Sequence, residues 1–92
     1  MDKGREEHAK RRALEIYGID FGPRTREFFV NSIQNNRAIL LEKTSRTRGA
    51  FAVDYKDSWI PVIYDEKIKN IITFLPPEDL VPYQERLSGE KK

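Results

Sequence analysis

The chain has 92 residues, a formal net charge of +2, 35% charged and 38% hydrophobic residues, and 11% aromatic residues. This length accommodates one small domain, and the aromatic content argues against a disordered chain. The absence of cysteine excludes disulfide scaffolds, thiol catalysis and iron–sulfur clusters. The single histidine, His8, excludes zinc fingers and sites with paired histidines, so we expect neither a metal nor a cofactor.

Targeting segments are not expected in this chain. The longest apolar runs, such as Ala38–Leu41, are far shorter than the ~20 residues that a membrane span needs. The first eight residues lack the apolar core of a signal peptide. We therefore expect a cytoplasmic protein that makes no contact with a membrane.

Two helices are predicted first in the chain. From Asp2 to Tyr17, apolar residues recur at helical spacing on one face, at Ala9, Ala13, Ile16 and Tyr17. Gly18 favours an end there, because glycine adopts the left-handed conformation without a steric penalty. Ile19 and Phe21 are expected to enter the core. A second helix should begin near Thr25 and end around residues 35–36, with Phe28, Phe29 and Ile33 among its apolar residues.

Four strands are predicted to follow. Their ranges are Ala38–Glu42, Phe51–Tyr55, Trp59–Tyr64 and Ile71–Leu75. Short connections between them favour an antiparallel meander, with the two helices on one of its faces. The predicted fold class is therefore α+β, in the order α-α-β-β-β-β, as a single domain over residues 1–77. Residues 78–92 contain few apolar side chains and are expected to form a polar, partly disordered tail.

Positive charge is concentrated in the first half of the chain, where residues 1–48 contain 11 Lys or Arg and 7 Asp or Glu. Three of these cations, Lys43, Arg46 and Arg48, lie with three hydroxyl side chains in the link between the first two predicted strands. Arginine can bind phosphate bidentately, and hydroxyl groups can donate to phosphate oxygens. The link is therefore a candidate RNA contact; the alternative is a solvated hairpin turn.

A polar stripe runs beside the apolar face of the first helix. It contains Arg5, His8, Arg12 and Glu15, which are three or four residues apart. His8 lies at the rim between core and solvent. Histidine has an unperturbed pKa near neutrality, so His8 is the natural acid or base of this chain. The alternative is that His8 is an ordinary surface residue.

These patterns resemble a known superfamily. The helix with His8-Ala9-x-x-Arg12, the stop at Tyr17-Gly18-Ile19, the second helix and the four strands are similar to the BECR superfamily of small ribonucleases, which includes barnase, EndoU, colicin and RelE-type nucleases. The likeness is strongest to the branch of BrnT-like and colicin-D-like toxins and related phage and mobile-element proteins. It covers roughly residues 8–76. In that branch an arginine often precedes the Gly-Ile pair, whereas this chain has Tyr17.

The resemblance implies a toxin-like endoribonuclease that needs no metal. His8 would transfer a proton and Arg12 would hold the phosphate, while Thr73 or Tyr64 would complete the site from the sheet. The product would be a 2′,3′-cyclic phosphate, and DNA would be inert because it lacks the 2′-hydroxyl. RNA contacts are expected at Lys43, Arg46, Arg48 and Arg5. The partners would be RNA, either tRNA or mRNA, and an antitoxin.

Two other interpretations remain open. Many small phage and mobile-element proteins bind a host protein complex, for example a CRISPR effector, and inhibit it without chemistry; the mild charge of this chain fits that role. A nucleic-acid-binding module that stacks bases on sheet aromatics is the third interpretation. Phe51 and Phe74 are instead expected in the core, together with Leu40, Val53 and Val62.

Overall fold

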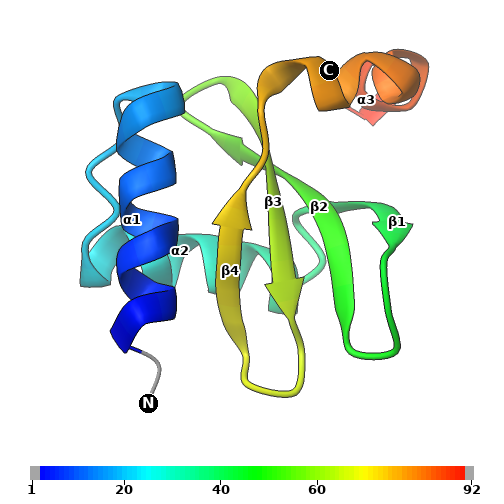
Figure 1. Ribbon diagram of the computed structural model, residues 1–92. Helices are drawn as coiled ribbons and strands as arrows, with labels where there is room; N and C mark the ends of the chain where they lie inside the picture. The colour runs from blue at the N-terminus through cyan, green and yellow to red at the C-terminus, as the bar shows by residue number, and fades with distance from the viewer. Residues whose placement is uncertain (1–2, 91–92) are drawn as a thin grey trace.

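The computed structural model describes residues 3–90, and it describes residues 3–6 and 90 by their backbone alone. Two helices come first: α1 (Lys3–Tyr17) and α2 (Pro23–Gln34). Four strands follow them: β1 (Ile39–Lys43), β2 (Arg48–Tyr55), β3 (Ser58–Asp65) and β4 (Asn70–Phe74). A 3-10 helix, η1 (Pro77–Tyr83), and a short helix, α3 (Gln84–Glu90), come last (Figure 1).

The strands form one sheet in the order β1-β2-β3-β4, and every neighbouring pair is antiparallel. The turn between β2 and β3 consists of Lys56 and Asp57, which have φ angles of 51° and 65°. Positive φ at both central residues is typical of a two-residue hairpin whose twist matches that of the strands. The predicted α+β class, with two helices before a four-stranded antiparallel meander, is confirmed.

The end of α1 follows the prediction. Gly18 has a φ of 67°, and its N–H donates to the carbonyl of Leu14 at 3.0 Å. The N–H of Ile19 donates to the carbonyl of Ala13 at 3.2 Å, so both bonds satisfy carbonyls of the last turn. Past this stop, Ile19 and Phe21 turn into the core, as the sequence predicts.

One face of the sheet packs against α1 and α2. Its buried core includes Ala9 and Ala13 from α1, Phe21 and Phe29 from the second helix and its approach, and Val53, Val62 and Phe74 from the strands. The rings of Phe21 and Phe74 meet edge to face, with centroids 4.8 Å apart. α1 runs alongside β4, whereas α2 passes behind the sheet (Figure 1).

The expectation that Leu40 lies in this core is wrong, because 43% of its surface is exposed. The pairing of β1 with β2 shifts between Leu40 and Glu42. Leu41, which is buried, faces the second side of the sheet together with Ile39, as the alternation of side chains along a strand requires.

The second face of the sheet is covered by the end of the chain. Leu80 of η1 and Leu87 of α3 are buried there against Ala50 and Ala52. Residues 77–90 are therefore helical and packed, which differs from the polar tail expected from residue 78. The small alanine side chains leave room on this face, and two leucines seven residues apart fill it. The guanidinium of Arg86 also donates to the carbonyl of Leu40 at 2.8 Å.

Candidate active site

The candidate site lies where α1 meets the edge strand β4. Ala9 and Ala13 are fully buried, and their small side chains let the helix approach the strand closely. His8, which precedes Ala9, is exposed and stands at the rim of this contact. Its Nε2 lies 3.0 Å from the hydroxyl oxygen of Thr73 on β4. The structure thus brings together two of the predicted site residues, 65 positions apart in the chain.

A β-bulge shapes the strand at this point. Ile63 pairs with Thr73 and Tyr64 pairs with Ile71, which leaves Ile72 as an extra residue in β4. Bulges bend the strand and redirect neighbouring side chains. Thr73 is half-buried, and its hydroxyl also lies 3.5 Å from the carbonyl of Phe74. The irregular edge therefore presents a hydroxyl group to the helix.

Arg12 lies one helical turn beyond His8 and is half-buried. Within the part of the chain that the structure describes, its guanidinium makes no hydrogen bond or ion pair. All of its donors are therefore available to a bound anion. Its positive charge also acts on Tyr17, which lies at the end of the same seam between α1 and β4.

Tyr17 joins the end of α1 to the end of β4, because its hydroxyl donates to the carbonyl of Leu75. The pKa of Tyr17 is raised to about 12, mainly by burial and to a smaller extent by the nearby carboxylates of Asp79 and Glu78, against an opposing effect of Arg12. The sequence predicts Tyr17 as the last residue of the apolar face of the first helix and as a departure from the family pattern, without a place in the site. Its position, one residue before the glycine that ends the helix, is the sequence feature that could have indicated this contact.

Tyr64 does not join His8 and Thr73. Only 5% of its surface is exposed, and it packs edge to face with Phe51 at a centroid distance of 6.0 Å. Its hydroxyl accepts a hydrogen bond from the side-chain amide of Gln34, at the end of α2, at 3.0 Å. The structure therefore places Tyr64 in the core beneath α2, away from the seam between α1 and β4.

Three of the predicted RNA contacts, Lys43, Arg46 and Arg48, lie at or beside the turn between β1 and β2, toward the opposite edge of the sheet from β4. Arg46 is exposed, and the ammonium of Lys43 donates to its carbonyl at 3.1 Å. Arg48 is bound within the protein, since its Nε lies 3.0 Å from the carboxylate of Asp65. The side chain of Arg5 lies outside the described residues.

Asp65, at the end of β3, links the β3–β4 hairpin to the β1–β2 hairpin through Arg48. Burial alone would raise its pKa, but hydrogen bonds from Arg48 and from the backbone of Lys67 and Ile68 outweigh burial and lower it. The backbone N–H of Glu66 also donates to the carbonyl of Thr47 at 2.8 Å. Arg48 is therefore occupied by a structural contact, whereas Lys43 and Arg46 present their charge to solvent.

The chain matches no family model, and searches of curated proteins and of solved structures returned no match. Within residues 3–90, no helix has the length and apolar character needed to cross a membrane. The described residues also contain no group of three or more metal-ligating His, Asp or Glu side chains. The placement of His8, Arg12 and Thr73 is therefore the feature from which a function can be inferred.

Proposed function

We propose that this protein is a toxin-like endoribonuclease that cleaves RNA without a metal and leaves a 2′,3′-cyclic phosphate. The observation that carries the proposal is the 3.0 Å contact between Nε2 of His8 and the hydroxyl of Thr73. Arg12 lies one helical turn beyond His8, and no hydrogen bond or ion pair to the described residues takes up its donors. The seam between α1 and β4 therefore carries a proton-transfer group beside a hydroxyl, with a guanidinium on the next turn of the helix.

The proposed reaction is an internal transesterification. A bond forms between the 2′-oxygen and phosphorus, and the bond from phosphorus to the 5′-oxygen breaks. The 2′-hydroxyl loses one proton and the departing 5′-oxygen gains one, so no further reactant is needed. His8 transfers one of these protons and water the other, while Arg12 holds the phosphate as negative charge builds up.

Thr73 is a positioning residue in this mechanism. A neutral imidazole can accept the threonine proton at Nε2 or donate its own proton to the hydroxyl oxygen. Either hydrogen bond fixes the ring plane of an otherwise exposed side chain. The ring is thereby oriented before substrate arrives, which reduces the ordering cost of the reaction. The resemblance to BECR nucleases, which implies a site residue on the last strand, supports the same role.

The test is incubation of the purified protein with single-stranded RNA at neutral pH in a chelator, followed by mass spectrometry of the termini. Wild type should yield 2′,3′-cyclic phosphate ends. His8→Ala should lower the rate by about 10²–10⁴-fold, the usual range for loss of general acid–base catalysis. Its melting temperature should change little, because His8 is exposed.

Arg11→Ala is the matched control, since it removes a cation from an exposed position of the same helix. It should keep full cleavage activity. In a second control, wild-type protein should leave a substrate with deoxyribose at every position intact. Wild-type protein that leaves RNA intact, or a His8→Ala variant as active as wild type, would overturn the proposal. The binding of a host protein complex would then become the favoured interpretation.

A further inference from the structure

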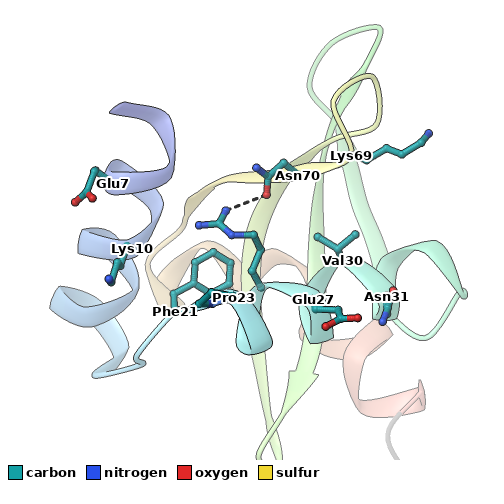
Figure 2. A pocket seen from close by; sticks show the side chains of 11 residues that line it. Glu7, Lys10, Phe21, Pro23, Glu27, Val30, Asn31, Lys69 and Asn70 are labelled. Atoms are coloured by element: carbon teal, nitrogen blue, oxygen red, sulfur yellow. Dashed lines mark hydrogen bonds between the residues drawn. The ribbon is translucent and has the colours of Figure 1, made fainter. Parts of the chain in front are cut away.

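A polar cleft outside the candidate active site lies between α1, the start of α2 and the turn that precedes β4 (Figure 2). Its volume is about 570 Å³, within the usual range for ligand sites. Its cationic lining consists of Lys10, Arg26 and Lys69, none of which was predicted as a site residue. Phe21 and Asn70 also line the cleft, and both contact Arg26.

Arg26 is held in place by two contacts. Its guanidinium carbon lies 4.8 Å from the centre of the Phe21 ring, which is itself buried. Its Nη1 donates to Oδ1 of Asn70 at 2.9 Å, as the dashed line in Figure 2 shows. The same Oδ1 accepts the backbone N–H of Ile71 at 2.8 Å, so the amide is fixed as well. The guanidinium is therefore ordered in advance and retains free N–H donors.

The charge of the cleft fits one type of anion. Two carboxylates, Glu7 and Glu27, also line it, yet neither forms an ion pair with Arg26 within the described residues. Three cations and two carboxylates leave a formal excess of one positive charge. This excess matches an RNA phosphodiester, which carries one negative charge, better than a phosphate monoester, which carries about two at pH 7.

The cleft is separate from the His8 seam but close to it. Asn70 and Thr73 lie three positions apart on β4, while Lys10 and His8 project from different sides of α1. We propose that the cleft binds a backbone phosphodiester of single-stranded RNA that is also held at His8. This inference rests on the proposed function, because the ligand is its substrate, and it extends the binding surface to residues Lys10, Arg26, Lys69 and Asn70.

The test uses a fluorescein-labelled 2′-O-methyl RNA, which keeps the backbone charge but offers no 2′-hydroxyl for attack. Anisotropy titrations at several salt concentrations give the affinity and its salt dependence. Arg26→Gln should weaken binding about tenfold and lower the slope of log K against log[salt] by about 0.7, the loss of one phosphate contact to a single strand. Lys10→Gln and Lys69→Gln should act in the same direction.

Arg24→Gln is the matched control, since Arg24 is exposed on the same helix and does not line the cleft. It should leave the slope unchanged. Lys10 and Lys69 are exposed, so their variants remain informative even if Arg26→Gln unfolds the protein. Equal slopes for the cleft variants and Arg24→Gln would overturn the inference, as would inorganic phosphate binding as tightly as the oligonucleotide.

The two proposals fail in distinguishable ways. If RNA is never cleaved but binding still depends on Arg26, the ribonuclease proposal fails and the cleft remains an RNA site. If RNA is cleaved at His8 but the slope does not depend on Arg26, Lys10 or Lys69, the cleft assignment fails alone. Absence of any binding to the oligonucleotide at low salt would refute the cleft assignment.

Discussion

His8 and Thr73 lie 65 residues apart in the chain, yet the imidazole Nε2 of one is 3.0 Å from the hydroxyl oxygen of the other. The contact spans the line along which α1 packs beside β4. Two local features produce it: the buried alanines of the helix permit close approach, and the bulge at Ile72 changes the course of the strand. This single hydrogen bond therefore depends on the packing of α1 against β4, and it sets the geometry of the candidate site.

The role of Thr73 in positioning His8 can be tested with Thr73→Val and Thr73→Ser. Valine has a similar shape but no hydroxyl, so we expect RNA cleavage to fall by about tenfold, the equivalent of one hydrogen bond of roughly 1.4 kcal/mol. Serine keeps the hydroxyl and should restore most of the activity. The measurement is the initial rate as a function of pH for each variant.

A purely structural role of Thr73 would give a different result. In that case Thr73→Val would lower the melting temperature but leave the rate of the folded protein unchanged at every pH, and serine would give no specific rescue. The positioning role instead predicts that valine lowers the rate at every pH while the melting temperature stays near that of wild type, because the ring loses the hydrogen bond that orients it.

Alkaline pH should destabilise the protein through Tyr17. Its folded pKa is raised to about 12 from an ordinary value of 10.0, chiefly by burial. A raised folded pKa contributes stability that is fully present below pH 10 and is lost as the pH rises through 12. Urea unfolding between pH 9 and 12 should show this loss in wild type. Tyr17→Phe should remove the part of the slope that comes from this hydroxyl.

Tyr83→Phe is the control for Tyr17, since that hydroxyl lies at an exposed contact with Glu42 on the other face of the sheet. Its effect on the alkaline slope should be smaller. If Tyr17→Phe unfolds with the same pH dependence as wild type, the hydrogen bond to Leu75 does not contribute to the loss of stability at alkaline pH.

Acid pH should act through Asp65. Its folded pKa is lowered from the ordinary 3.8, because hydrogen bonds from Arg48 and two backbone groups outweigh its burial. A lowered folded pKa contributes stability that is fully present above pH 3.8 and is lost as the pH falls through the folded value. Asp65→Asn should cost about 1–2 kcal/mol at pH 7, because it removes hydrogen bonds to a charged group.

Thermal unfolding at pH 7 and at pH 3 distinguishes this contribution from general acid effects. The difference between the two pH values should shrink in Asp65→Asn. Glu66→Gln removes the neighbouring carboxylate, which is exposed, and should keep the wild-type difference. An Asp65→Asn variant with the wild-type difference would show that the Arg48 pair is not the acid-sensitive contact.

The sequence predicted α1, α2 and the four strands because their signals are local. The apolar spacing of α1, the stop at Gly18 and the alternation in β2 each depend on neighbours within a few residues. The phase of α1 also placed His8 at the rim beside Ala9, where the structure has it. The partner on β4 was suggested by family resemblance, since no local pattern specifies a contact across 65 residues.

The structure also departs from expectation at Tyr64 and at the end of the chain, for physical reasons that can be identified. Tyr64 continues the alternation of Ile60 and Val62 along β3, so its side chain faces the core with theirs. A side chain in the core is not available to the exposed His8. The end of the chain reads as polar because charged residues outnumber its few leucines. The burial of those leucines depends on a vacant face of a distant sheet, which the local composition does not reveal.

The final prediction concerns that C-terminal segment. Leu87 is 3% exposed and packs with Leu80 against the second face of the sheet. Truncation to alanine removes buried methyl groups and leaves a cavity, so Leu87→Ala should cost about 2–3 kcal/mol. Trp59, the only tryptophan, packs against the same cluster, so its fluorescence should report urea unfolding. Val81→Ala is the control, because Val81 is 62% exposed and should change stability by less than about 0.5 kcal/mol. Equal stabilities of the two variants would mean that α3 contributes no packing energy to the sheet, and the chain beyond Pro77 would then behave as the polar tail that its composition suggests.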